Sequence, residues 1–503
     1  MTRPRTPARH LALAVALLLL MAAIRLHNLT LQEPFIDEGA HVQRARVVWS
    51  FDEHPGRFAN GKLLLYYWLG LFELPPISAL WIARTAIALA SLLTGAAVYA
   101  IARMAGSAGA GALALAAYAV LPLAFFFERM ALADPFAAMF AALAVWQSVR
   151  FARRPTVRAA IAVGLLCAAA TLAKLTTGLV PLIPLAAALA CFPPRGNNRS
   201  VWWYEWRRRY GTGIALAWGI VVLCWLPVVV PAAVAQVRGD PFTLVNGANL
   251  ADLGDPAPLA ELRAAIPAIA RYTSAPLLVG SGAALIGLAW RARRDPSLRT
   301  WAAALIAWTV LLALLPPVAS RNVRTRYFMP LAAPLSVTAG CTAWVLWRAR
   351  RPLIRLAVAS ASAIWLAGFA IPFALTAVRT PDDLRLPPND AAVFLGGNFA
   401  GDAMREAARL IDAADPSVLV LADRATCDML TFFTARPITC ADDIARPVEL
   451  LNAPESYVVL NGHEPQPERL RLVWELVGEF ERPALQERAG VTRTVQVWRV
   501  RAP

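Results

Sequence analysis

Charged residues are scarce in this sequence: they make up 16% of its 503 residues, against roughly 25% in an ordinary globular domain. Hydrophobic residues make up 58%, and the mean hydropathy is +0.51. The apolar residues gather in blocks of about 20, which is the length of a helix that crosses a bilayer. Lipid offers the backbone no hydrogen-bond partners, so such blocks must be helical. The composition excludes a soluble enzyme and predicts a polytopic α-helical membrane protein.

Cysteine is also scarce, with six residues. No CxxC or Cys/His spacing indicates zinc, and six cysteines are too few for a disulfide scaffold. Four of them lie in or beside apolar blocks and are expected to be small buried hydrophobes. Cys427 and Cys440 both fall in the polar C-terminal segment. They could form a disulfide if that segment lies outside the cytoplasm.

Acidic residues are fewer than basic ones, which gives a formal net charge of +16. The positive charges form short clusters between the apolar blocks, and no basic stripe with interleaved aromatics lies outside them. We therefore expect the lipid bilayer, with its anionic surface, to be the partner of these charges, and we expect no nucleic acid.

Eleven apolar blocks are predicted to cross the membrane. The first, residues 11–26, follows three arginines and is expected to be a retained signal anchor. The other ten cover residues 84–103, 108–127, 135–150, 159–173, 176–192, 212–235, 274–290, 300–318, 328–347 and 354–378. Within residues 28–83 the aromatic stretch LLLYYWLGLF is short, and we expect it to lie along the membrane interface.

The arginine clusters indicate the orientation, because cytoplasmic loops carry an excess of Lys and Arg. With the N-terminus in the cytoplasm, every dense cluster falls on the cytoplasmic side. These clusters are Arg103, VRFARRPTVR, PRGNNRSVWWYEWRRR, RARRDPSLR and RARRPLIR. An odd number of spans then places the C-terminal segment outside. The predicted location is the bacterial inner membrane, with the C-terminal segment in the periplasm.

Two domains follow from this map. Residues 1–378 are predicted to form the transmembrane domain, with residues 28–83 as its first outer loop. Residues 379–503 are polar and are predicted to form a small α/β domain. In it VFLGG, SVLVLA, YVVLNG and VQVWRV indicate strands, and DAMREAARLIDAA and ERLRLVWELV indicate amphipathic helices.

Carboxylates occur in two of the outer loops. Asp37 and Glu38 are adjacent and follow the first span by about ten residues. They fit either solvated loop acids that cap the helix near Gly39 or a functional pair. Asp134 precedes Pro135, so it fits a helix N-cap as well as a site residue.

Cations occur in the outer loops as well. Lys174 stands alone between two apolar blocks, where it could simply extend its ammonium toward the interface. Arg321, Arg324 and Arg326 run against the charge bias of an outer loop, and an anionic group at the outer surface would account for them. Carboxylates and cations on one rim suit transfer of a sugar from a lipid phosphate. A carboxylate would deprotonate the acceptor hydroxyl, and cations would stabilise the leaving phosphate.

Four motifs in this order resemble the GT-C glycosyltransferases, in particular the bacterial branch similar to protein O-mannosyltransferases and the aminoarabinose transferase that acts on lipid A. They are DE at Asp37 and Glu38, ERMALAD with Arg129 and Asp134, LAKLTTG with Lys174, and RYFMPLAAPL with Arg326 and Tyr327. The segment NGKLLLYYWLGLF resembles the juxtamembrane segment of that family. It differs in one respect, because Lys62 is followed by two leucines where the family usually has two prolines.

The resemblance implies a fold of about eleven transmembrane helices with juxtamembrane helices in the first outer loop. It implies transfer from a polyprenyl-phosphate-linked sugar donor to a hydroxyl of an acceptor glycan, lipid or protein, with inversion at the anomeric carbon. Asp37 would be the general base, Glu38 would orient the base or the acceptor, and Asp134 would be the second acid. The carrier phosphate would be bound by Lys62, Arg129, Lys174, Arg326 and Tyr327.

No cofactor is expected by this resemblance. Some members of the superfamily use a divalent metal, and Glu38 and His41 stand at helical spacing as candidate ligands. Two other functions remain open: a multi-span transporter or flippase of an envelope lipid or glycan, and a membrane-anchored scaffold. The charged residues crowd one face and leave the spans almost free of charge at mid-depth, which disfavours a translocation path.

Overall fold

The computed structural model describes residues 8–52, 54–192, 199–240, 258–320, 323–397, 399–401, 403–441, 453–461, 472–481 and 494–501. The chain forms two compact units. The helical unit comprises Met1–His27, Phe51–Leu65 and Ile87–Ala374, and the sheet unit comprises Asn28–Ser50, Tyr66–Ala86 and Leu375–Pro503.

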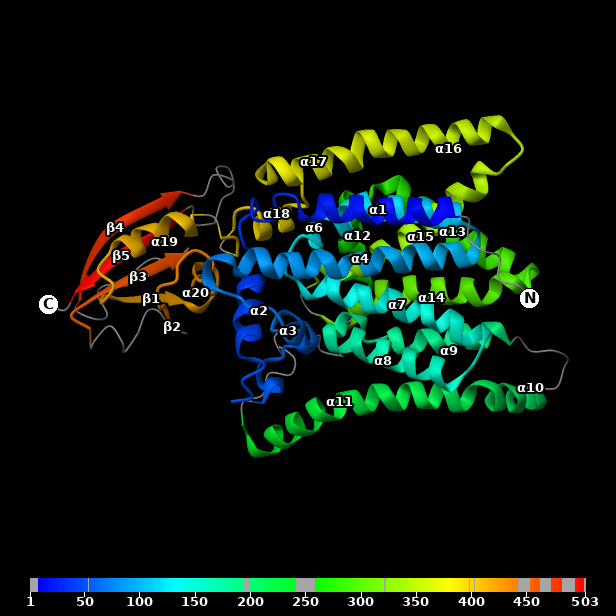
Figure 1. Cartoon of the computed structure of the whole chain (residues 1–503), viewed down its shortest axis with the longest axis horizontal. Helices are drawn as coiled ribbons and strands as arrows, with labels where there is room; N and C mark the ends of the chain where they lie inside the picture. Colours follow the sequence, from blue (N-terminus) through cyan, green and yellow to red (C-terminus); the bar gives the residue numbers. More distant parts are fainter. Residues whose placement is uncertain are drawn as a thin grey trace. The chain divides into compact units, whose positions relative to one another are not determined.

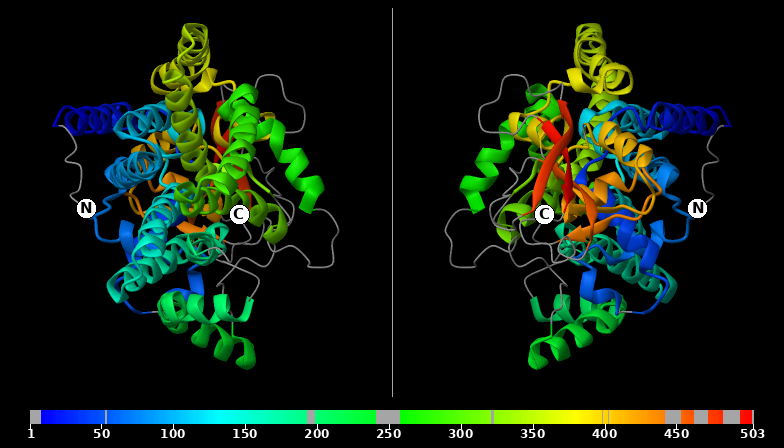
Figure 2. Two further views of the ribbon diagram at one scale, coloured as in Figure 1. Left: turned by 90° about the vertical axis from the view of Figure 1, so that its right-hand side faces the viewer. Right: turned by 90° about the vertical axis from the view of Figure 1, so that its left-hand side faces the viewer.

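Long apolar helices dominate the helical unit, and they run side by side (Figure 1). Figure 2 looks along several of them. The main helices are α1 (Ala8–Leu26), α4 (Ala79–Ala105), α5 (Ala108–Val120), α6 (Pro122–Phe127), α7 (Ala133–Arg153), α8 (Val157–Ala173), α9 (Ile183–Cys191), α10 (Arg199–Trp206), α11 (Thr212–Arg238), α12 (Pro258–Thr273), α13 (Ala275–Arg294), α14 (Pro296–Ala319), α15 (Ala332–Trp347), α16 (Pro352–Trp365) and α17 (Ile371–Arg379). The first residues of α4 and the last of α17 are assigned to the sheet unit.

Short 3-10 and π segments join or interrupt these helices. They are η1 (Pro55–Phe58), η2 (Pro76–Ser78), η3 (Leu175–Thr177), η4 (Val180–Leu182), η7 (Thr325–Leu331) and η9 (Pro381–Asp383), with π segments at η5 (Arg207–Gly211) and η8 (Leu366–Ala370). The predicted interfacial stretch forms α3 (Leu63–Leu69). Its seven residues are far too few to cross a bilayer.

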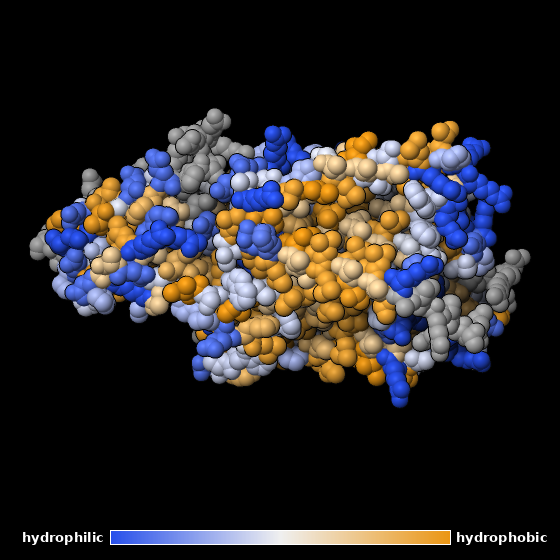
Figure 3. Space-filling model, turned by 45° about the horizontal axis from the view of Figure 1, so that its top comes forward, coloured by the Kyte–Doolittle hydropathy of each residue, from blue (hydrophilic) through white to orange (hydrophobic). Residues whose placement is uncertain are grey.

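Among the described residues, eight helices are long and apolar enough to span a membrane. Three shorter apolar helices lie at Ala108–Val120, Val157–Ala173 and Leu175–Cys191. Together these elements coincide with the eleven predicted blocks, while the number that actually crosses stays a prediction. Figure 3 shows hydrophobic side chains covering the surface of these helices, as expected of helices that face lipid.

The sheet unit contains a five-stranded mixed sheet with the order β2-β1-β3-β5-β4. Its strands are β1 (Leu419–Asp423), β2 (Thr439–Ala441), β3 (Glu455–Asn461), β4 (Val473–Glu481) and β5 (Thr494–Arg501). β1 pairs in parallel with β2 and β3, whereas β5 is antiparallel to β3 and β4. The helices of this unit are α2 (Ile36–Val47), α18 (Pro388–Phe394), α19 (Met404–Ala413) and α20 (Arg424–Leu430).

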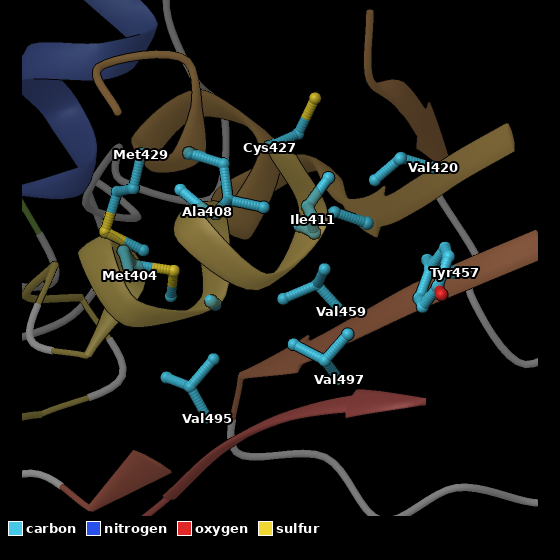
Figure 4. Packing of buried hydrophobic residues seen from close by; sticks show 13 residues of the cluster. Met404, Ala408, Ile411, Val420, Cys427, Met429, Tyr457, Val459, Val495 and Val497 are labelled. Carbon is cyan, nitrogen blue, oxygen red and sulfur yellow. The ribbon is translucent and has the colours of Figure 1, made fainter. Parts of the chain in front are cut away.

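The core of the sheet unit lies between its helices and one face of the sheet. Figure 4 shows Met404 and Ile411 of α19 directed toward Val459 and Val497 of the strands. Ile36 of α2 packs against the same core. Asn28–Ser50 and Tyr66–Ala86 thus group with the C-terminal residues, and Phe51–Leu65 groups with the helical unit. The predicted domain bounds stay a prediction.

Two of the predicted elements in the C-terminal segment were wrong. VFLGG was predicted as a strand, but its second residue, Phe394, is the last residue of helix α18. That helix begins at Pro388, and proline is favoured at the first position of a helix. ERLRLVWELV was predicted as a helix, but its described part enters strand β4, where Trp474 pairs with Val500 and Leu476 with Trp498. Pairing with β5 overrides the local helical pattern. The strands SVLVLA, YVVLNG and VQVWRV and the helix DAMREAARLIDAA are confirmed.

Candidate functional site

An ion pair between Asp134 and Lys174 lies inside the helical unit. Asp134 stands in the first turn of α7, where the helix dipole favours a negative charge. The N-cap of that helix is Leu132, so Asp134 does not cap it. Lys174 ends α8 in an extended conformation, and its Nζ lies 2.6 Å from Oδ1 of Asp134. The two residues are only 1% and 7% exposed, so the pair lies in a poorly hydrated place.

Further cations gather around this pair. The charges of Arg326 and Lys62 act on Lys174 through space. The Lys174 Nζ lies 4.5 Å from the centre of the Tyr327 ring, and the Arg326 guanidinium carbon lies 5.6 Å from it. Burial lowers the pKa of the Lys174 ammonium, and these two neighbouring cations lower it further against the opposing effect of Asp134. Three cations and one carboxylate therefore interact with one another at this place.

A tight turn brings Lys62 to this place. Asn60 and Gly61 both have positive φ, at 46° and 69°. A Cβ added to Gly61 would lie 3.1 Å from Cδ1 of Leu175, the residue that follows Lys174. The turn therefore packs directly on the segment that carries the second lysine.

The identity of these cations is itself informative. Of the 49 Lys and Arg residues, Lys62 and Lys174 are the two lysines, and all others are arginine. The chain thus has arginine at all the remaining basic positions and has lysine, with its compact and flexible ammonium group, at this cluster. We name Lys62, Lys174, Arg326 and Asp134, with the ring of Tyr327, the lysine cluster.

Arg129 lies close to the C-terminal end of α1. Its guanidinium donates to the carbonyl oxygens of Ile24, Arg25 and His27 at 3.0, 2.9 and 2.7 Å. These carbonyls lie at and just beyond the C-terminal end of α1, where a helix has no backbone donors of its own. A cation here stabilises the helix end.

A second buried ion pair lies beside Arg129. The Arg25 Nε donates to Oε2 of Glu128 at 2.9 Å, and both side chains are fully buried. The Tyr118 hydroxyl donates to the other oxygen of this carboxylate. Glu128 thus stabilises the packing of α1 against the following helices, and its partners could not be predicted from the sequence.

In the sheet unit, α2 carries the adjacent carboxylates. The Glu38 carboxylate is fully buried and receives Arg84 Nε at 2.8 Å on one oxygen and Arg84 Nη2 at 2.6 Å on the other. The second oxygen also accepts the backbone N–H of Phe35, which closes the first turn of α2. Glu38 therefore fixes the helix that bears Asp37. Asp37 itself is half-buried.

The predicted metal candidates Glu38 and His41 have other neighbours. Glu38 is engaged by Arg84, and His41 is buried with its ring 5.8 Å from that of Tyr66. Within the part of the chain that the structure describes, no group of three or more His, Cys, Asp or Glu residues could hold a metal ion.

Two residues of the sheet unit were missed by the sequence analysis. Arg84 was treated as the start of a span, although an arginine next to an apolar block is itself a signal. Asp428 lies on α20, which packs against α2, and the electrostatic interactions of its carboxyl include Asp37, Arg44, Arg424 and Asp423. Burial, together with the charges of Asp37 and Asp423, raises the pKa of Asp428 to about 6, although Arg44 and Arg424 oppose this.

The comparisons with known proteins agree with the predicted family resemblance. Residues 67–225 match the family model of dolichyl-phosphate-mannose-protein mannosyltransferases. The structure is similar to ArnT from Cupriavidus metallidurans in the apo state, with a TM-score of 0.60 and 16% identity over 97% of both chains. The same protein bound to undecaprenyl phosphate gives a TM-score of 0.56 and 15% identity over 98% of both chains.

The oligosaccharyltransferase of Archaeoglobus fulgidus in the apo form is also similar, with a TM-score of 0.52 and 12% identity. That match covers 89% of this chain and 69% of the archaeal one. No curated protein sequence matches the chain. The predicted resemblance to GT-C glycosyltransferases is confirmed, and at these identities it establishes a shared fold: a multi-span helical membrane protein with a small C-terminal sheet.

Proposed function

We propose that this chain is a membrane glycosyltransferase that moves a sugar from a polyprenyl-phosphate carrier to an acceptor hydroxyl. The fold shared with ArnT and the mannosyltransferase family model support this class of reaction. The observation that carries the proposal is the lysine cluster, in which Lys62 and Arg326 act on the buried ion pair of Lys174 and Asp134. A phosphate group at this place would accept charge-assisted hydrogen bonds from these cations.

In this reaction, Asp37 accepts the proton of the acceptor hydroxyl. The acceptor oxygen then forms a bond to the anomeric carbon, while the bond from that carbon to the phosphate oxygen breaks. The electron pair stays on the phosphate, where Lys62, Lys174 and Arg326 stabilise the charge as it grows. Attack from the face opposite the phosphate inverts the anomeric carbon.

The remaining predicted site residues act indirectly in this proposal. Asp134 holds the Lys174 ammonium in place, and Tyr327 supports it with the face of its ring. Glu38 positions α2 through Arg84. Arg129 stabilises the end of α1 through its Nη1 hydrogen bonds.

The side of the membrane also belongs to the proposal. The arginine clusters favour a cytoplasmic N-terminus, with the reaction and the C-terminal segment in the periplasm. Reporter proteins fused after residues 200 and 295 should then report the cytoplasm, and one fused after residue 380 should report the periplasm. A cytoplasmic signal from the last fusion would contradict this orientation.

Phosphate binding can be tested by differential amine labelling, because the lysine cluster contains both lysines of the chain. Undecaprenyl phosphate should protect Lys62 and Lys174 of the purified full-length protein from an amine-reactive acetylating reagent, as measured by mass spectrometry. The N-terminal amine is the internal control and should be labelled equally with and without the lipid. Equal lysine labelling in both samples would contradict a phosphate site at this cluster.

Two lysine variants separate charge from geometry. Lys174→Met should weaken undecaprenyl phosphate binding by about 10- to 100-fold, since a hydrogen bond to a charged group contributes about 1.5–3 kcal/mol. Lys174→Arg keeps the charge and should retain more of the affinity, although its planar group fits the pair with Asp134 less well.

Transfer itself is tested by mass spectrometry of envelope lipids and glycans from cells with and without the protein. Asp37→Asn should remove the sugar-bearing product, because loss of a general base typically costs about 10² to 10⁴ in rate. The variant should still bind undecaprenyl phosphate with unchanged affinity. Full activity of Asp37→Asn would overturn the assignment of the base, and accumulation of an untransferred lipid on one leaflet would favour a flippase.

A further inference from the structure

An apolar cavity of about 390 Å³ lies among α4, α5, α13, α14 and α15 of the helical unit. Its volume is within the range of ligand sites, which is about 300–1,000 Å³. Ala284, Gly287 and Arg291 of α13 line it. They stand on one face of α13, because residues three or four apart in a helix are neighbours. We name this space the arginine-end cavity, since Arg291 lies in the last turn of α13.

The interior of the arginine-end cavity suits hydrocarbon better than water. Two polar side chains of its lining are engaged by the backbone. Thr338 Oγ1 donates to the carbonyl of Pro334 at 2.8 Å, and Trp301 Nε1 donates to that of Ile101 at 3.0 Å. A buried water needs two to four polar partners, whereas apolar groups need none.

A second cavity, of about 370 Å³, adjoins the first among α5, α13, α15 and α16. Thr342 and Leu346 line both cavities. Along α13 the joint lining extends from Pro276 to Arg291, which is about 22 Å at 1.5 Å per residue. Half the thickness of a bilayer's hydrocarbon core is about 15 Å. The two cavities together therefore have room for the full length of the chains of a lipid in one leaflet.

The cavities are kept open by glycines and are accessible from the side. A Cβ added to Gly287 in the first cavity or to Gly280 in the second would meet no described atom within 4 Å. Trp290 and Val345 also line the first cavity, and they are 53% and 51% exposed. A lipid can therefore enter from the bilayer without passing through the protein.

Aromatic and cationic side chains surround one end of the arginine-end cavity. Trp290 and Trp344 belong to its lining. The Arg294 guanidinium carbon lies 3.9 Å from the centre of the Trp290 ring, and that of Arg348 lies 5.6 Å from the centre of the Trp344 ring. Tryptophan and arginine together are typical of the level of the lipid headgroups. This end of the cavity therefore lies where a headgroup would be.

The charge at this end complements an anion. In residues 284–305 and 338–351, which form this part of α13, α14 and α15 with their ends, Asp295 is the only acid. Its carboxylate is engaged locally, because it accepts the N–H and the hydroxyl of Ser297 at 2.9 and 2.7 Å. Arg291 is the cation that lines the cavity itself. A basic pocket between transmembrane helices is a typical site for an anionic lipid headgroup.

We propose that the arginine-end cavity binds one anionic phospholipid. Its phosphate accepts hydrogen bonds from Arg291, and one of its acyl chains extends along α13 past Gly287 toward Gly280. This site is separate from the lysine cluster, and the proposal does not rest on the proposed transferase function.

Native mass spectrometry of the purified full-length protein tests the proposal. The probes are dioleoyl phosphatidylglycerol, which is anionic, and dioleoyl phosphatidylcholine, which has the same chains and no net charge. Gly287→Leu fills the cavity, and Arg291→Gln removes its charge. The matched controls are Gly282→Leu and Arg293→Gln, because both residues lie on α13 and neither lines a cavity. Thermal unfolding checks that each variant is folded.

The wild type should retain one molecule of phosphatidylglycerol and bind phosphatidylcholine about tenfold more weakly. Arg291→Gln should weaken phosphatidylglycerol binding about tenfold, because a hydrogen bond to a charged group is lost. Gly287→Leu should weaken the binding of both lipids by about tenfold or more, since its side chain occupies the space of the acyl chain. Both controls should stay within about twofold of the wild type.

Four results would overturn the proposal. Equal affinity for the two lipids would mean that the charge is not recognised. Unchanged phosphatidylglycerol binding in Gly287→Leu would place the lipid elsewhere. If Gly287→Leu weakened only undecaprenyl phosphate binding, the chain of the sugar carrier would be the occupant. If the variant converted a dimer to a monomer, the occupant would be a second copy of this chain.

Discussion

Replacement of Arg84 by methionine is expected to destabilise the sheet unit strongly. The Arg84 side chain is fully buried and donates five hydrogen bonds. Two of them reach the Glu38 carboxylate, and the others reach the carbonyl oxygens of Leu29, Gln32 and Glu33 at 2.6, 2.7 and 3.1 Å. One guanidinium thus joins the start of α4 to α2 and to the loop before it.

The expected magnitude follows from what methionine leaves behind. Removing one partner of a buried ion pair costs about 3–5 kcal/mol, because the other charge stays buried without compensation. Each carbonyl that cannot reach water adds about 1–3 kcal/mol. We expect a loss of about 5 kcal/mol or more, which lowers the unfolding temperature of a unit of this size by about 10–20 °C.

Thermal unfolding of the purified full-length protein, followed by tryptophan fluorescence and limited proteolysis, measures this loss. Arg405→Met is the matched control, since Arg405 pairs with Glu33 at 3.7 Å with side chains 43% and 28% exposed. Such an exposed pair contributes about 0–1 kcal/mol. The double variant Arg84→Met, Glu38→Leu should regain part of the stability because no lone charge remains. Unfolding of Arg84→Met within 2–3 °C of Arg405→Met would refute the reasoning.

Three further predictions follow from the same structure. The folded state holds the Asp428 proton more tightly than the unfolded state, with a pKa of about 6 against the ordinary value of 3.8. The free energy of unfolding should therefore fall as the pH rises from about 4 to 6. The free energy of unfolding should change by at most about 3 kcal/mol over this range. In Asp428→Asn this change should be absent when thermal unfolding is measured between pH 4 and 8. Arg129→Gln leaves three carbonyl oxygens at the end of α1 without a charged donor, so it should lower the unfolding temperature. The affinity for undecaprenyl phosphate should stay unchanged. A weaker affinity would show that Arg129 binds the phosphate. Cys427 and Cys440 form the disulfide that the sequence suggested, so they should resist alkylation until a reductant is added, and the variant Cys427→Ser, Cys440→Ser should be less stable by up to about 3 kcal/mol through loop entropy.

The transmembrane helices could be predicted because a lipid-facing helix must be apolar along its whole length, so the signal is local. In the sheet unit the local signal was weaker. The buried strands β1 and β3 were predicted from continuous apolar runs, but β4 was not, because its polar face toward solvent imitates an amphipathic helix. Only the pairing of β4 with β5 decides its conformation.

The lysine cluster could be predicted in part. The sidedness of the arginine clusters placed Lys62, Lys174 and Arg326 on one rim, since charge bias is readable along the chain. The partners of these charges could not be predicted from the sequence, because an ion pair can join residues that are distant along the chain. The family resemblance implied that Arg129 binds the carrier phosphate, which stays a prediction, whereas its hydrogen bonds to the end of α1 could not be predicted.

Gly39 is the one residue whose type indicated a close contact of α2 with another part of the chain. Glycine within a helix costs roughly 1 kcal/mol relative to alanine, so Gly39 in IDEGAHVQRARV is unfavourable by propensity alone. The structure supplies the reason, because any side chain at that position would collide with the carbonyl of Asp428. A glycine beside a candidate base therefore indicates close approach of another backbone, although the sequence does not reveal which.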